Sequence, residues 1–170
     1  VAEAVGTTGS AWGAEGAGVA TIASPAALHG LRAPLSKPPL TTPPAGGVVN
    51  GGFESGALSP WSAAGDAIVA TPAHSGTHAL QVVPTASATG EAAQNVTLAP
   101  NHAYTLKAWV QGSYAYVGVR GGANASTWTS SSGWTQLSVP FTTGASGAVT
   151  VYVHGWYGQS ALYADDFTIG

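Results

Sequence analysis

Large aromatic rings and polar side chains alternate with small apolar residues in three segments of this chain, Tyr104–Gln111, Tyr114–Arg120 and Val149–Trp156. Successive side chains of a strand point to opposite faces of its sheet, so each segment predicts one apolar face and one face of rings and polar groups. Ring faces stack against the C–H faces of sugars, and polar side chains bind sugar hydroxyls, and neither contact requires a net charge. The three segments therefore favour a carbohydrate-binding surface.

The residues of this surface have three expected roles. Stacking platforms for sugar rings are expected at Trp109, Tyr116 and Tyr152, and groups that bind hydroxyls at Lys107, Gln111, Arg120 and His154. The border of the site is expected at Tyr114, Trp156 and Tyr157, with Trp128 as a further extension. The aromatic residues expected in the core instead are Phe53, Trp134, Phe141, Tyr163, Phe167 and Trp61, the last with a cleft wall as its alternative. A plainer interpretation of any one ring is packing against a neighbouring strand, worth roughly 0.2–1 kcal/mol per pair. Three segments that repeat one design favour a ligand surface, since contiguous aromatic patches mark interaction sites.

The composition excludes several kinds of partner. Only 6% of the 170 residues are charged, with 4 Lys and Arg against 7 Asp and Glu, which is too little positive charge for nucleic acid or an anionic membrane. Cysteine is absent, so any metal site must use oxygen or imidazole ligands. The chain begins with Val1 and has no run of about 18 apolar residues, so we expect a mature or excised piece of a longer chain without a membrane span.

Changes in composition along the chain predict three parts. Residues 1–32 are rich in Gly and Ala and are interpreted as an N-terminal segment, the possible end of an upstream domain. Residues 33–47 contain five prolines, which favour an extended linker. Residues 48–170 carry short β-rich runs without helical periodicity, typical of an all-β, antiparallel β-sandwich of the jelly-roll kind. The predicted strands are Ala67–Ala70, Ala79–Val83, Glu91–Leu98, Ala103–Val110, Ala115–Arg120, Thr127–Thr129, Gln136–Thr142, Val149–His154 and Ala161–Ile169.

The part from Val48 to Gly170 resembles carbohydrate-binding modules of families 4, 9 and 22, which accompany secreted bacterial glycan-degrading enzymes. The resemblance rests on these landmarks in order: Asn50-Gly51-Gly52-Phe53-Glu54 with Trp61, His74-Ser75-Gly76, Tyr104-Thr105-Leu106, Trp134, Phe141-Thr142-Thr143 and Tyr163-Ala164-Asp165-Asp166-Phe167. It implies a jelly-roll sandwich and a glycan site on one sheet, and it would place the three alternating segments together on that sheet. It also implies a secreted, extracellular protein and a covalently linked catalytic domain.

The same resemblance implies a structural calcium near the paired ends of the domain. Its ligands would be the side chains of Glu54 and Asp166, with Asp165 as second choice, and main-chain oxygens of Gly52 and of the turn around Gly76. The chemistry agrees, because Ca²⁺ takes six to eight hard oxygen ligands that carboxylates and carbonyls of Gly-rich turns supply. Without a metal, Glu54 would be a cap or surface acid and the Asp pair a turn motif.

Two other functions stay open at this stage. A polysaccharide lyase could use Tyr152 or His154 to abstract a proton and Arg120 to neutralise a uronate, although one Arg and one Lys are few cations for such a substrate. A hydrolase would need two facing carboxylates, and none of the remaining acids, Glu91 included, is expected on the aromatic face. An adhesion domain that binds a protein would also use exposed Tyr and Trp.

Overall fold

The computed structural model describes residues 46–170, and these form eight β-strands and no helix. The four shorter strands of the first half are β1 (Ser62–Ala64), β2 (Asp66–Ala70), β3 (Ala79–Val83) and β4 (Glu91–Thr97). The second half contains β5 (Ala103–Gly121), β6 (Ala125–Thr142), β7 (Ala148–His154) and β8 (Leu162–Ile169). With no helix in this part, none could span a membrane. The sequence predictions for residues 1–32 and for 33–45 lie outside the described residues.

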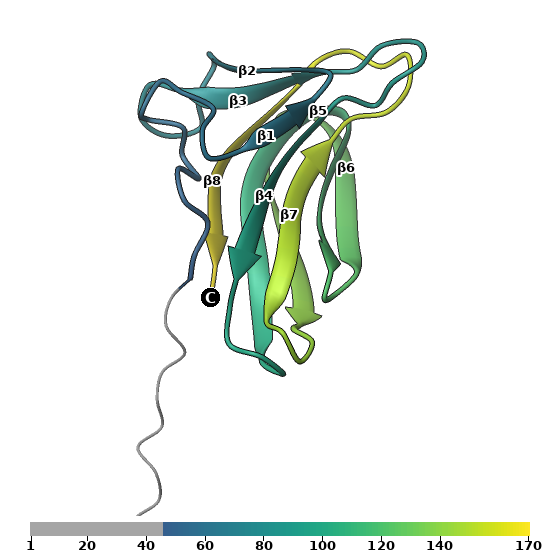
Figure 1. The fold of residues 1–170 in the computed structure, drawn as a ribbon. Coiled ribbons are helices and arrows are strands. Elements are labelled where there is room, and N and C mark those ends of the chain that lie inside the picture. Colours follow the sequence, from purple (N-terminus) through teal and green to yellow (C-terminus); the bar gives the residue numbers. More distant parts are fainter. Residues whose placement is uncertain (1–45) are drawn as a thin grey trace, which may run out of the picture. The chain divides into compact units, whose positions relative to one another are not determined.

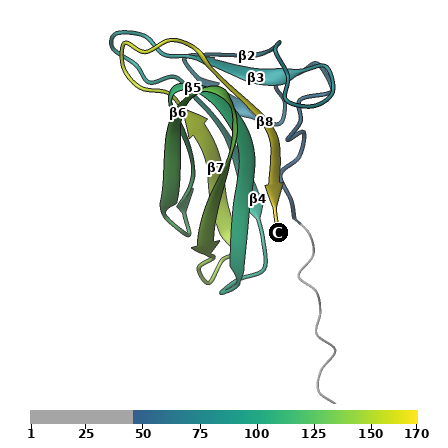
Figure 2. The same cartoon turned by 180° about the vertical axis from the view of Figure 1, so that it is seen from behind.

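All the strand pairs are antiparallel, and the two long strands join two layers of a sandwich (Figure 1, Figure 2). The C-terminal half of β5, from Tyr116 to Gly121, pairs with β7, which leads through β4 to β1. The N-terminal half, from Leu106 to Gln111, pairs with β8, which leads through β3 to β2. We call these the β7 layer and the β8 layer, and β6 pairs with β5 along both of them.

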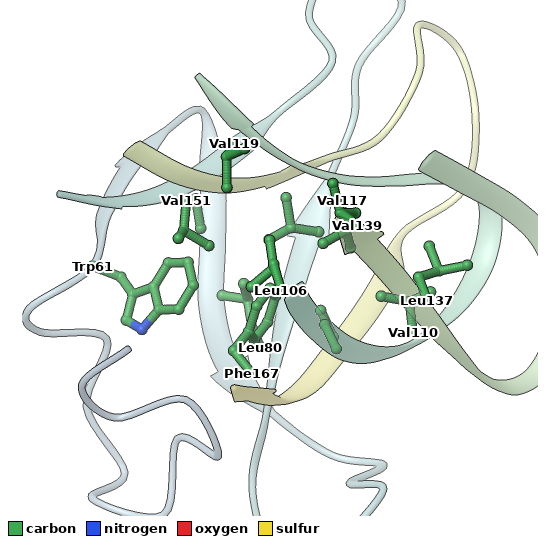
Figure 3. Packing of buried hydrophobic residues seen from close by; sticks show 14 of the residues in the cluster. Trp61, Leu80, Leu106, Val110, Val117, Val119, Leu137, Val139, Val151 and Phe167 are labelled. Carbon is green, nitrogen blue, oxygen red and sulfur yellow. The ribbon is translucent and has the colours of Figure 1, made fainter. Parts of the chain in front are cut away.

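The core lies between the two layers and comes from the apolar half of each alternating strand (Figure 3). Leu106, Ala108 and Val110 face it from the N-terminal half of β5, and Ala115, Val117 and Val119 from the other half, all 1% exposed or less. The predicted apolar faces of β5 and β7 are thus confirmed, except that Tyr104 of β5 is half-buried. An aromatic group fills the end of the core near β8, where the Trp61 ring lies 4.8 Å from that of Phe167 and 5.5 Å from that of Phe53.

The all-β, antiparallel sandwich predicted from sequence is confirmed, while several strand limits differ. The runs at 103–110 and 115–120 belong to one strand, because Gly112 occupies an irregularity between them with φ of +125° instead of ending the strand. A Cβ at Gly112 would lie 2.8 Å from the Leu162 Cα, so glycine lets β8 approach there. The runs at 127–129 and 136–142 likewise form the single strand β6.

Candidate functional site

A group of stacked rings lies across β5, β6 and β7. Tyr116 on β5 is directly opposite His154 of β7 and Trp128 of β6. Its ring centroid lies 4.8 Å from that of His154 and 5.8 Å from that of Trp128, with interplanar angles of 8° and 26°. Tyr114 continues the group, stacked on Trp128 at 5.3 Å. Near-parallel rings at these spacings are offset-stacked, so Tyr116 has a ring against it toward both flanking strands.

The rings that remain open to solvent lie around Tyr116. Trp128 is 50% exposed, Trp156 43% and Tyr157 50%. The loop that carries Trp156 and Tyr157 is fixed at both ends, because the amides of Gly155 and Gly158 donate to the carbonyls of the β3–β4 connection at Thr89 and Thr85. Tyr114, a predicted border residue, is 37% exposed. These four side chains therefore offer exposed ring surface around the half-buried Tyr116. Trp128, which the sequence offered only as an extension of the site, stacks on both Tyr114 and Tyr116 and is central to the ring group.

A polar pocket adjoins the ring group on the same face of the β7 layer. It has a volume of about 470 Å³ and is lined by Glu91, Val119, Arg120, Asn124, Ala125, Ser126, Tyr152 and His154. Tyr152 is directly opposite Gly118, and a Cβ on Gly118 would come within 2.5 Å of the Tyr152 hydroxyl oxygen. The missing side chain therefore gives the Tyr152 ring its place across β5. The Arg120 guanidinium carbon lies 5.0 Å from the centroid of that ring, within cation–π range.

Glu91 is the residue of this pocket that sequence reasoning placed wrongly. It is opposite His154 and accepts two hydrogen bonds from Arg120, at 2.6 Å from Nη1 and 2.7 Å from Nη2. These bonds raise the pKa of the Arg120 guanidinium. The Arg120 side chain is 44% exposed, so the pair contributes about 0–1 kcal/mol to folding. Glu91 is the sole acid among the residues that line the pocket, so no facing pair of carboxylates for hydrolysis exists there.

Three predicted site residues lie over the other layer. Trp109 pairs with Asp165 of β8 and Gln136 of β6, and Lys107 and Gln111 pair with Thr168 and Tyr163 of β8. The expectation that all three alternating segments share one surface is therefore wrong for these residues, because β5 passes from one layer to the other between Trp109 and Tyr116. The Trp109 ring is also covered by the His74 imidazole, stacked at 3.9 Å and 12°. Their part in glycan binding stays a prediction, now without its geometric basis.

Two other aromatic predictions need correction at the same layer. Trp134, expected in the core, is half-buried and meets the His74 ring edge-on at 5.6 Å. Tyr163, also expected in the core, is half-buried and its hydroxyl accepts a 2.7 Å hydrogen bond from the Gln81 amide. Tyr163 alternates with the buried Leu162 and Ala164 of β8, so the period-two pattern puts it on the outer side. Trp134 follows the exposed Gly133 and precedes the half-buried Thr135, in a part of β6 that does not face the core.

The acidic residues predicted to bind calcium are brought together at one end of the β8 layer. A Cβ at Gly52 would lie 3.5 Å from Asp166 Oδ1, 3.8 Å from Asp165 Oδ1 and 3.9 Å from Glu54 Cγ, so the three acids surround this glycine. The 74–78 turn lies against all of them. Glu54 accepts hydrogen bonds from the amides of Thr77 and His78, at 3.0 and 2.8 Å.

The two Asp carboxyls are held differently. Asp165 is fully buried, and burial raises its pKa although it accepts bonds from the amides of Ser75, Asp166 and His74. Asp166, half-buried, accepts a bond from the Ser75 hydroxyl at 2.8 Å and contacts His74 Nδ1 at 2.7 Å. Hydrogen bonds from the amides of His78 and Thr77 lower the pKa of Glu54.

These residues suit calcium in the type of their ligand atoms. Carboxylate oxygens and the carbonyls of Gly-rich turns are the donors that Ca²⁺ prefers. Within residues 46–170, however, no three or more Asp, Glu or His side chains form a group that could hold a metal ion. In this conformation the 74–78 turn donates to the carboxylates directly, so main-chain and water oxygens would have to complete the ligand set.

Comparison with known proteins relates most of the described part of the chain to one family. The profile of a family described as "Carbohydrate binding domain" matches residues 45–161. Exochitinase 1 of Streptomyces olivaceoviridis is 46% identical over 124 residues, which cover 71% of this chain. The match covers only 21% of the length of that relative.

Solved structures agree with this relation. The structure of TmCBM61 in complex with β-1,4-galactotriose is similar with a TM-score of 0.58 and 27% identity, over 72% of this chain and 96% of the other. The CBM22-1 xylan-binding domain of Paenibacillus barcinonensis Xyn10C has a TM-score of 0.52 at 20% identity, over 69% of this chain and 89% of the other. The latter likeness concerns the fold alone.

Proposed function

The chain belongs to this family of carbohydrate-binding domains, and we propose that its glycan site is the face of the β7 layer formed by Trp128, Trp156, Tyr157 and the pocket of Glu91, Arg120 and Tyr152. One observation carries the proposal: three half-exposed aromatic rings lie beside a polar pocket on the same face. Rings bind the apolar faces of sugars and the pocket binds hydroxyls, which is the mixture that glycan recognition requires.

The glycan itself is proposed from the relatives. Exochitinase 1 takes its name from activity on chitin, and at 46% identity its matching segment makes a β-1,4-linked N-acetylglucosamine chain our first candidate. The galactotriose complex of TmCBM61 makes β-1,4-galactan the second. Both ligands are chains of uncharged sugars, and a row of rings next to a pocket suits several units of such a chain better than a single sugar.

The setting of the domain is part of the proposal. We infer that it is secreted and covalently joined to a catalytic domain, which it holds close to the polysaccharide. The support is that the chain covers only 21% of the exochitinase, and that a solved structure of similar fold contains a CBM22-1 module together with a xylanase module. Binding without catalysis is the role that we assign to residues 46–170.

Calcium binding is proposed for the acidic residues around Gly52, beside the β8 layer. The side chains of Glu54 and Asp166, with Asp165 as second choice and the carbonyls of Gly52 and Gly76, would hold the ion. The support is the convergence of the three acids around Gly52 and the hard oxygen chemistry of this donor set. The ion would fasten the segment that enters the domain to its last strand.

The experiment that tests the function compares two tryptophans of the same strand pair. We expect Trp128→Ala to weaken binding of chitotetraose by about tenfold, which corresponds to about 1.4 kcal/mol, since loss of an aromatic interface residue typically costs more than about 1 kcal/mol. Trp109→Ala is the matched control, because it removes the same side chain from the other layer. Isothermal titration calorimetry measures the affinities, and thermal unfolding verifies both folds. Equal losses in the two variants, or loss in the control alone, would place the site elsewhere.

A further inference from the structure

We propose that the Glu91–Arg120 pair is the specificity-determining element of this surface: it binds neighbouring hydroxyls of a neutral sugar and excludes glycans that carry carboxylates. The inference rests on the proposed function and adds the ligand's charge and the residues that select it. Nothing in the sequence indicates that Glu91 and Arg120 form an ion pair, because they are 29 positions apart. The pairing of β4 with β7 and of β7 with β5 brings them together.

The first step concerns the atoms that the pair leaves open. Arg120 uses two terminal N–H groups on Glu91, one for each carboxylate oxygen. A guanidinium has five N–H donors and a carboxylate about four acceptor positions, so both groups retain capacity on their solvent side. A hydroxyl both donates and accepts. Two adjacent hydroxyls of a pyranose can therefore accept from the Arg120 side and donate to the Glu91 side at once.

The second step concerns charge. Residues 46–170 contain two Lys or Arg residues, and the other one, Lys107, pairs with β8 in the opposite layer. The single guanidinium at the pocket is already neutralised by Glu91 in a bidentate arrangement. A uronate that entered the pocket would meet the Glu91 carboxylate as a like charge, and it would have to displace that carboxylate to reach Arg120. The same contacts that suit a diol thus oppose an acidic sugar.

The third step places Glu91 in the path of a chain. Glu91 also lines a second hollow, together with Ala64, Gly65, Ser87, Ala88, Thr89, Gly90 and Tyr157. On β4, Glu91 pairs with Ala64 of β1, which lines this hollow, and with His154 of β7, which lines the pocket of Arg120 and Tyr152. An oligosaccharide that occupies both hollows therefore contacts Glu91.

The test uses matched neutral and acidic tetrasaccharides. Calorimetry would compare β-1,4-linked tetramers of N-acetylglucosamine, galactose and glucose with the β-1,4-linked glucuronic acid tetramer, which differs from the glucose tetramer at C6. Wild type is expected to bind at least one neutral tetramer and to bind the acidic one at least about tenfold more weakly than that neutral tetramer. Glu91→Gln frees the guanidinium. It should weaken neutral binding about tenfold and strengthen binding of the acidic tetramer in a salt-sensitive way.

The double variant Glu91→Gln/Arg120→Gln is the control for charge. It should lose the gain for the acidic tetramer, because the freed guanidinium is gone. If wild type binds acidic and neutral tetramers equally, or if Glu91→Gln folds normally and leaves their ratio unchanged, the selective role of the pair is wrong while carbohydrate binding stands. If wild type binds no tetramer, both the proposed glycan site and its proposed selectivity are wrong. Near-ultraviolet circular dichroism identifies a variant that fails to fold. In that case Arg120→Lys, which keeps the positive charge but cannot bind both oxygens of Glu91 in a bidentate way, must show weaker binding of the neutral tetramers.

Discussion

Gly118→Ala is expected to weaken glycan binding although it removes no group that could touch the ligand. The added Cβ would lie 2.5 Å from the Tyr152 hydroxyl oxygen, 2.6 Å from its Cζ and 2.7 Å from the carbonyl oxygen of Ala125. Carbon contacts are optimal at about 3.5–4.0 Å, so the ring has to move by roughly 1 Å. That movement takes Tyr152 away from Arg120 and from its stacked position at His154.

The size of the effect follows from what the ring loses. A displaced aromatic contact is worth about 0.5–1.5 kcal/mol, which corresponds to roughly a 2- to 10-fold loss of affinity. Overpacking against the Ala125 carbonyl should lower the free energy of unfolding by about 1–3 kcal/mol. Isothermal titration calorimetry with chitotetraose and urea unfolding measure the two effects.

Gly133→Ala is the matched control for this substitution. Gly133 lies on β6, has no positive φ, and a Cβ there meets nothing within 4 Å. Both variants reduce the freedom of the unfolded chain equally, so the difference between them isolates the steric effect. In the double variant Gly118→Ala/Tyr152→Ala the binding losses should not add, because both act through one ring. If Gly118→Ala binds and unfolds like the control, Tyr152 does not lie over Gly118 and the pocket is described wrongly.

Three other outcomes are expected. Addition of calcium should raise the melting temperature of wild type and a chelator should reverse this, whereas Glu54→Gln, a proposed calcium ligand, should respond less; equal melting curves with and without calcium would argue against the metal site. Affinity for neutral β-1,4-linked oligosaccharides should increase from one to three or more units, since Glu91 separates two hollows, and a monosaccharide that binds as well as a tetramer in calorimetry would contradict an extended site. Trp61→Ala should lower the free energy of unfolding by about 3–5 kcal/mol in urea titrations, because the ring is 4% exposed and packs on Phe53 and Phe167, and a loss below 1 kcal/mol would contradict that packing.

The alternation of apolar and polar residues was sufficient to predict the class of the fold. Apolar residues at every second position of 104–110, 115–119 and 149–153 predicted inward faces, and the structure buries each of them except Tyr104, which is half-buried. Phe53, Trp61 and Phe167 were also expected inside and are 4% exposed or less. These predictions succeed because the side-chain direction of a strand depends on its own sequence alone.

The local sequence pattern did not predict which strands lie beside each other. Trp109 and Tyr116 belong to one strand with the same alternation, yet Trp109 pairs with β8 and Tyr116 with β7. Gly112 and Tyr114 both have positive φ at the irregularity between them, and of the two only the glycine is a signal for it in the sequence. Nothing near Trp109 in the sequence indicates that His74, 35 positions earlier, covers its ring.

The amino-acid pattern alone was enough to predict the antiparallel sandwich, most of its core residues and the two acidic segments, because alternation and turn chemistry are local properties of the chain. Which outward residues are neighbours depends on the folded structure. It gathered Trp128, Trp156 and the Glu91–Arg120 pair on the β7 layer and moved Trp109 to the β8 layer. The physical reason is that a pleated strand fixes which face a side chain takes, whereas the register and order of the strands, which arise from packing of the whole chain, fix what lies beside it.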